Sequence, residues 1–161
     1  MPELTPYCLV TVTDQKALDA VHDSGSNNGS FRDRHPWFVA RELLELARSN
    51  QEIVPLVFVV EPDLILKDWA VIRDIEVATY SGQAFETRCT FTRLRPVNPI
   101  FEALDSVVLL PSSEQVHRET LEPIRTYRQH LDALHLYPYA ICETPAFAYT
   151  DAEIGPAEQT D

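Results

Sequence analysis

The sequence predicts an α+β fold: a small, mostly antiparallel β-barrel with helices inserted between the strands. β-prone runs at 53–60, 69–78 and 84–95 follow one another with short links, which is typical of an antiparallel meander. A doubly wound parallel sheet does not fit these runs, because it would need helices between them. The strings PYCLV at 6–10 and PYAIC at 138–142 are similar strands near opposite ends of the chain. We expect these terminal strands to pair and to close the sheet into a barrel.

Two helices are expected before the meander. Residues 14–25 begin at Asp14, a residue type favoured at helix N-caps, and carry apolar residues at helical spacing. Residues 36–50 begin with a proline, which the first turn of a helix tolerates. The apolar positions of this second helix share one broad face, made of Trp37, Ala40, Leu43, Leu44 and Ala47.

The length of 161 residues, of which 45% are hydrophobic, favours a single globular domain over residues 1–150. Residues 151–161 hold four acids and no base, and we expect them to form a flexible acidic tail. The longest apolar run, 53–60, is too short to span a bilayer, and no secretory signal is visible. Three widely separated cysteines without a CxxC pair predict buried thiols and no zinc site. These features favour a cytoplasmic protein with no cofactor, no metal and no membrane partner.

The formal charge of −12 counts against a broad basic surface for nucleic acid. Only two of the 13 basic residues are lysines. The positive charge therefore comes mostly as planar guanidinium groups, which can bind anions with two parallel hydrogen bonds.

The stretch DSGSNNGSFRDRHPWF, residues 23–38, is the first candidate site. Its glycines allow the backbone to approach a ligand closely, and its serines and asparagines offer donors and acceptors. Arginine and histidine could contact phosphate, and aromatic rings could stack on a base. The alternative is a polar surface loop whose arginines pair with neighbouring acids and whose tryptophan lies in the core. The residues predicted to bind ligand here are Ser26, Asn27, Asn28, Arg32, Arg34 and Trp37, and Phe31, His35 and Phe38 are further possible contacts.

Trp69 and Arg73 are the second candidate, because strand alternation places them on one face of 69–78. Trp69 could form the wall of a ligand pocket and Arg73 could bind an anion. The alternative is that Trp69 packs in the core and Arg73 pairs with an acid such as Glu76 or Glu86.

A third group of arginines, in the string TRCTFTRLRP, could form an anion-facing strand. These residues are Arg88, Arg93 and Arg95. A solvated sheet face, with cross-strand pairs to Asp74 and Glu76, is the alternative that we favour.

Motifs of common enzyme classes are missing. The chain has no GxSxG, no HExxH, no P-loop and no GxGxxG sequence. Its histidines are not accompanied by a recognisable set of carboxylate and nucleophile. We therefore expect no catalytic residues and a non-enzymatic role.

Three segments resemble the PUA-like barrel superfamily, which includes the EVE, ASCH and YTH types. They are SNNGSFRDRHPWFVAREL, IVPLVFVV and DWAVIRDIEV, within roughly residues 24–95. The resemblance implies a pocket between loop and barrel that reads a modified or flipped base. It would place Asn27, Asn28, Arg32, Trp37 and Trp69 at that pocket. The chain departs from the pattern in two ways: SNQE stands where these barrels commonly have a Gly-Asp strand-entry signal, and the usual basic surface is missing.

The sequence thus predicts non-enzymatic recognition of a nucleic acid, a nucleotide or a modified base. Stacking and hydrogen bonds to one base would tolerate an acidic chain. The alternative is an acidic protein-interaction module or inhibitor that binds a basic partner protein, for example by mimicking DNA.

Overall fold

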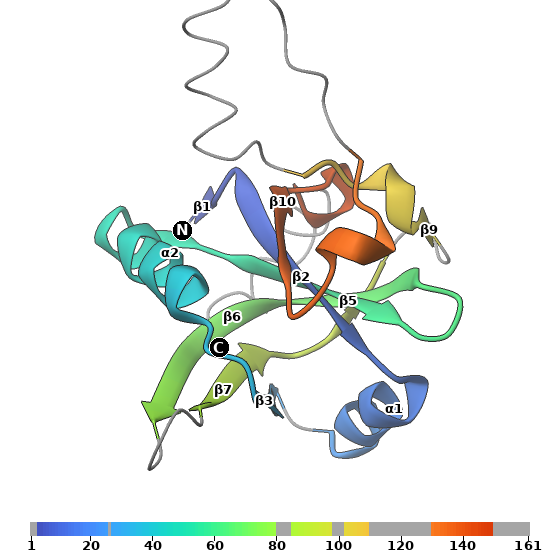
Figure 1. Ribbon diagram of the computed structural model, residues 1–161, viewed down its shortest axis with the longest axis horizontal. Coiled ribbons are helices and arrows are strands. Elements are labelled where there is room, and N and C mark those ends of the chain that lie inside the picture. The colour runs from blue at the N-terminus through green and yellow to red at the C-terminus, as the bar shows by residue number, and fades with distance from the viewer. Residues whose placement is uncertain (1–2, 26, 80–84, 98–101, 110–129, 150–161) are drawn as a thin grey trace, which may run out of the picture.

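Two helices and one long mixed β-sheet make up most of the chain that the computed structural model describes, namely residues 3–25, 27–79, 85–97, 102–109 and 130–149 (Figure 1). The elements in chain order are β1 Glu3–Leu4, β2 Tyr7–Thr13, α1 Gln15–Asp23, β3 Asn28–Asp33, α2 Phe38–Ser49, β4 Glu52–Ile53, β5 Pro55–Val60, β6 Ile65–Thr79, β7 Phe85–Thr92, β8 Arg95–Pro96, β9 Glu102–Ala103, η1 Leu104–Ser106, η2 Ala133–His135 and β10 Ala140–Glu143.

The main sheet is open, so the predicted closed barrel is wrong. Its strand order is β10-β2-β5-β6-β7-β3, with the short β8 and β9 also paired to β6. The meander β5-β6-β7 is antiparallel, as predicted, whereas β2 and β5 are parallel and are linked through α1, β3 and α2. Within the described residues no hydrogen-bonded ladder joins the edge strands β3 and β10. A barrel needs that ladder to close.

The pairing of the terminal strands is confirmed. β10 runs antiparallel to β2, and the two similar strings face each other with Cys142 opposite Cys8. This pairing does not close the sheet, because β2 is also bonded to β5 on its other side. β10 therefore ends the sheet instead of completing a circle.

The stretch that the sequence predicts as a loop contains a strand. β3 pairs with β7 along its whole length, with Arg32 opposite Arg88. Its residues alternate between exposed and half-buried, which is typical of an edge strand. Gly29 is required by packing, because a Cβ atom there would lie 2.4 Å from the Phe91 ring. Asparagine, glycine, serine and aspartate are poor strand formers, so it is the ladder to β7 that forms this strand.

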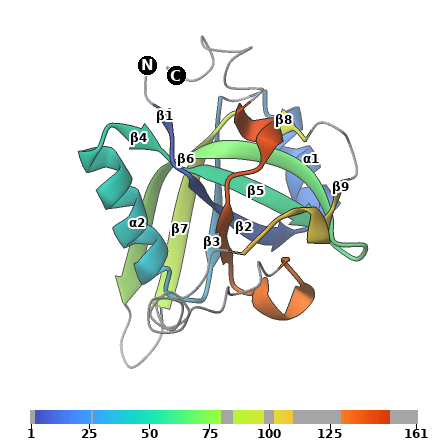
Figure 2. The same ribbon diagram turned by 90° about the horizontal axis from the view of Figure 1, so that it is seen from above.

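Both helices are confirmed. The Asp14 side chain accepts a hydrogen bond of 2.7 Å from the backbone N–H of Ala17 and so caps α1. α2 begins at Phe38, two residues after Pro36, and buries Ala40, Leu44 and Ala47. α2 packs against β6 and β4, and α1 follows the end of β2, away from α2 (Figure 2). Both helices contribute to the same core, α1 through Leu18.

The sheet separates two hydrophobic cores. The core on one face contains Trp69 and is covered by the segments around 104–109, 131–136 and 145–149. The core on the other face contains Trp37 together with α2, β3 and β7. The central strand β5, which begins at Pro55, lies between β2 and β6 and is almost entirely buried.

A β-bulge in β6 changes the predicted alternation. The register to β7 shifts between Ile72 and Asp74, so one extra residue, Arg73, stands in this strand. Beyond the shift, Ile75 joins the same core as Ala70 and Ile72. Ile75, which strict alternation would place on the face of Trp69, therefore lies on the opposite face.

No helix in the described segments is long and apolar enough to cross a membrane. The predicted acidic tail lies outside the described residues, and the single domain over 1–150 remains a prediction.

Candidate functional site

The two tryptophans predicted to line one pocket are both buried, and they lie in different cores. Trp37 is fully buried and contacts the ring of Tyr139, with 4.4 Å between ring centroids. Trp69 is also buried, in the core on the other face of the sheet, where it packs near Phe147. The structure therefore does not bring Trp37 and Trp69 together. Their roles in packing match the alternative that the sequence left open.

Arg73 lies apart from both tryptophans. It is half-buried at the bulge of β6, and its backbone carbonyl accepts a hydrogen bond from Arg48. Its Nε atom is buried without a hydrogen-bond partner among the described residues. None of the cavities described below includes Arg73.

The residues of the polar stretch are distributed along β3 and its ends. Ser26 lies outside the described residues, and Asn28 begins β3 on its exposed side. Asn27 lines a cavity of about 190 Å³, which we call the loop cavity. Its lining residues are Val21, His22, Gly25, Asn27, Arg93 and Leu94.

Arg32 and Arg34 are both exposed. The Arg32 Nε atom lies 3.3 Å from a carboxylate oxygen of Glu86, so this arginine is paired with an acid. This pairing matches the alternative interpretation of the stretch as a polar surface segment. Arg34 lies in the chain between β3 and α2. Its neighbours Asp33 and His35 line the second cavity, which is described below.

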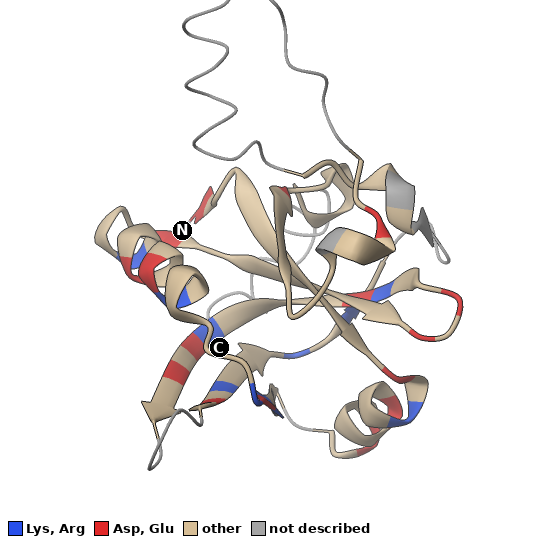
Figure 3. Ribbon diagram, in the orientation of Figure 1, with Lys and Arg blue, Asp and Glu red and all other residues tan. Residues whose placement is uncertain are grey.

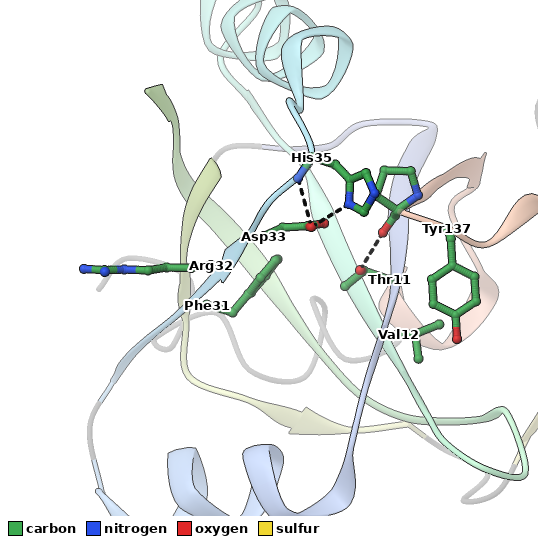
Figure 4. A pocket seen from close by; sticks show the side chains of 8 residues that line it. Thr11, Val12, Phe31, Arg32, Asp33, His35 and Tyr137 are labelled. Atoms are coloured by element: carbon green, nitrogen blue, oxygen red, sulfur yellow. Dashed lines mark hydrogen bonds and ion pairs between the residues drawn. The ribbon is translucent and has the colours of Figure 1, made fainter. Parts of the chain in front are cut away.

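A second cavity, which we call the slot, opens between the edge strand β3 and the end of β2. It has a volume of about 240 Å³. Figure 4 shows β3, β2 and the segment before β10 around it. Its lining residues are Thr11, Val12, Phe31, Arg32, Asp33, His35, Tyr137 and Pro138. The Arg32 side chain points away from the other labelled residues (Figure 4), so Arg32 lines the slot without filling it.

Asp33 and His35 form the polar centre of the slot. The Nδ1 atom of His35 lies 2.8 Å from Oδ1 of Asp33, and the backbone N–H of His35 donates to the same oxygen at 3.1 Å. The indole N–H of Trp37 donates to Oδ2 at 2.9 Å. Burial alone would raise the pKa of Asp33, but the hydrogen bonds from His35 and Trp37 lower it below its usual value. Asp33 is therefore held as a carboxylate.

A buried hydroxyl fixes the turn that carries this pair. Thr87 on β7 is fully buried, and its hydroxyl donates a hydrogen bond of 2.6 Å to the carbonyl of His35. The same oxygen accepts the backbone N–H of Trp37 at 3.1 Å. Because Thr87 bonds both sides of the turn between β3 and α2, His35 is positioned by the fold and not only by its neighbours in sequence.

The opposite wall of the slot comes from the segment before β10. The Tyr137 side chain is 57% exposed, and its hydroxyl donates a hydrogen bond of 2.5 Å to Glu61. That hydrogen bond raises the pKa of Tyr137, so the phenol stays protonated. The Thr11 hydroxyl donates to the carbonyl of Pro138 at 3.0 Å and ties β2 to this wall.

Sequence reasoning missed Thr11, Asp33 and Tyr137. Asp33 and His35 are separated by a single residue and flank Arg34, so their closeness could have been inferred. No local signal links them to Thr11 or Tyr137, because the open edges of the sheet bring these segments together.

A second histidine–aspartate pair lies beside the loop cavity. The Nε2 atom of His22, on α1, is 3.3 Å from Oδ2 of Asp68 on β6. The Asp68 side chain is only 5% exposed. Burial raises the pKa of Asp68, and the attraction of His22 and Lys67 only partly offsets this effect.

Within the described ranges there is no group of three or more histidine, cysteine, aspartate or glutamate side chains that could hold a metal ion. All three cysteines are buried, as predicted, and burial raises the pKa of both Cys89 and Cys142 to about 12. None of the three cysteines lines the slot.

No protein-family model, curated protein or solved structure matches this chain.

Proposed function

We propose that the slot binds one planar, hydrogen-bonding ring, the base of a nucleotide or of a nucleic acid. The observation that carries the proposal is the slot itself: an ionised Asp33, an oriented His35 and the rings of Phe31 and Tyr137 line one cavity at an open sheet edge. Its volume of about 240 Å³ is smaller than the ~300–1,000 Å³ of sites for drug-sized ligands. A single base therefore suits it better than a larger ligand.

Recognition of one base does not need a basic surface. Hydrogen bonds to the base edge and contact with aromatic rings supply the binding energy, and phosphates can stay in solvent. Arg34 is exposed and lies in the chain between Asp33 and His35, which line the slot, so it is a candidate for one phosphate contact. Affinity should then depend only weakly on salt, because few counterions are released. The resemblance to PUA-like domains points to the same class of ligand.

The test is a calorimetric titration with AMP, CMP, GMP and UMP and with a short single-stranded oligonucleotide of mixed sequence. We expect saturable binding of at least one nucleotide and a loss of tenfold or more in His35→Ala, which removes one polar contact. The matched control is His22→Ala, which removes the other aspartate-paired histidine and should bind as the wild type does. If no probe binds at millimolar concentration, or if His35→Ala binds normally, the proposal is wrong.

The second candidate is an acidic module that binds a basic protein. Two observations favour it: the net charge is −12, and Arg32 and Arg48 are paired with Glu86 and Asp74. Acidic residues are spread over both helices and β6 (Figure 3). The test is whether the protein displaces labelled duplex DNA from a histone dimer at low salt. Displacement without nucleotide binding would favour this candidate over the first.

A further inference from the structure

The polar hydrogens around the slot are already used inside the protein. The Thr11 hydroxyl donates to Pro138, and the Tyr137 hydroxyl donates to Glu61. Because an ionised carboxylate can only accept, the 2.8 Å contact between Asp33 and His35 requires a hydrogen on Nδ1 of His35. The slot therefore has few side-chain donors left to offer a ligand.

Several acceptors in the slot remain available. In a neutral His35 with its hydrogen on Nδ1, the Nε2 atom carries a free lone pair. A carboxylate has about four acceptor positions, and three donors already bond to Asp33. The hydroxyl oxygen of Tyr137 can accept a further hydrogen bond after donating its own. The slot thus presents mostly lone pairs.

The charges around the slot also favour a ligand that carries N–H donors. Asp33 is ionised within it, and Glu61 lies behind Tyr137. Arg32 points away from the slot (Figure 4) and pairs with Glu86. A phosphate inside the slot would meet the carboxylate of Asp33, whereas a group rich in N–H donors would be attracted.

We infer that the slot selects a base by its N–H donors, and that guanine, which presents a ring N–H next to an amino group, is preferred over uracil. This inference rests on the proposed function and names the base that the same site takes. Uracil presents one N–H between two carbonyls, which would face the acceptors of the slot. An unsatisfied buried acceptor costs about 1–3 kcal/mol, so we expect uracil to bind tenfold or more weakly.

Protonation of His35 would reverse one of these contacts. The imidazolium carries a hydrogen on Nε2 and could no longer accept a hydrogen bond from the base. The charged and titratable groups around His35 are Asp33 and Arg34 beside it and Tyr137 with Glu61 across the slot. Guanine should therefore bind more weakly to the imidazolium form of His35 than to the neutral form.

The test compares GMP with IMP, which lacks only the amino group, and with UMP, each titrated calorimetrically at pH 8. We expect GMP to bind most tightly, IMP to lose about tenfold and UMP to lose more. His35→Ala should fold normally, because 64% of the His35 side chain is exposed, and it should discriminate less between GMP and UMP than the wild type does.

Equal binding of GMP, IMP and UMP would overturn this inference and leave base recognition by the slot intact. Tighter binding of UMP than of GMP would also overturn it. Absence of binding by all three nucleotides, together with AMP and CMP, would instead overturn the proposed function.

Discussion

The two histidine–aspartate pairs consist of the same two residue types, yet their surroundings differ. Asp33 accepts hydrogen bonds from His35 and from the indole of Trp37, and its pKa is lowered. Asp68 is more deeply buried, meets His22 at 3.3 Å, and has a raised pKa. The number of donors around each carboxylate explains the difference, because each donor stabilises the ionised form against burial.

This comparison shows which pair suits ligand binding. In the slot the carboxylate also accepts hydrogen bonds from the indole of Trp37 and from the backbone N–H of His35, so His35 is oriented and keeps an acceptor atom for a ligand. Beside the loop cavity it is Nε2 of His22 that faces Asp68, and the buried carboxylate depends more on its histidine. The first pair therefore places an oriented side chain in an open cavity, whereas the second pair links α1 to β6.

The largest expected difference concerns the two aspartates. Asp33→Asn replaces a carboxylate that accepts from Trp37 and His35, and should lower the free energy of unfolding by about 3 kcal/mol, since hydrogen bonds to charged groups contribute about 1.5–3 kcal/mol each. Asp68→Asn removes a buried charge and should stay within about 1 kcal/mol of the wild type or stabilise it. Urea unfolding at pH 7 measures both variants. Equal losses would contradict the comparison.

A smaller effect is expected from two glycines, one near each pair. Gly29→Ala places a Cβ against the buried Phe91 ring and should cost about 2 kcal/mol, because overpacking a core typically costs 1–3 kcal/mol. Gly25 has a φ of 65° and open space around it, so Gly25→Ala should cost only about 1 kcal/mol through backbone strain. Thermal unfolding ranks the two. Gly29→Ala should also weaken nucleotide binding, since β3 carries the slot, and Gly25→Ala should not.

The smallest expected effect is the opposite dependence of the two aspartates on pH. The stability that Asp33 contributes is complete above its unfolded pKa, near 3.9, and is lost as the pH falls through its lowered folded pKa. The raised pKa of Asp68 has the opposite sign: ionised Asp68 costs stability near neutral pH, and this cost is relieved as the pH falls through its folded pKa. Unfolding free energies between pH 7 and pH 3 test both. Asp33→Asn should lose less stability than the wild type as the pH falls below 4. Asp68→Asn should lack the gain in stability that Asp68 gives the wild type as the pH falls toward 4.

Much of the fold could be predicted because its signals are local. The cap of α1 at Asp14, the apolar face of α2 and the meander β5-β6-β7 depend on residue spacing within each segment. The pairing of β2 with β10 could be inferred because the two strings are similar. These parts do not need long-range packing to be recognised.

The parts that could not be predicted depend on contacts between distant segments. β3 has the composition of a loop and is held as a strand by β7, and the bulge at Arg73 places Ile75 in the core opposite to that of Trp69. The open sheet edge depends on where β3 and β10 end, which no local pattern encodes. Of the predicted site residues, Arg32 lines the slot with its side chain turned away, and Arg34 lies beside it. The polar centre, Asp33 with His35, needed the contacts of Trp37 and Thr87 to be recognised.

The orientation of His35 is the central claim, and the nitrogen resonances of its imidazole ring test it most directly. In protein labelled with ¹⁵N at histidine and studied at pH 8, the two ring nitrogens can be assigned by comparison with His35→Ala. We predict that Nδ1 of neutral His35 carries the hydrogen and that Nε2 has the shift of an unprotonated nitrogen, because Nδ1 faces the Asp33 carboxylate at 2.8 Å. A hydrogen on Nε2 with an unprotonated Nδ1 would contradict the account.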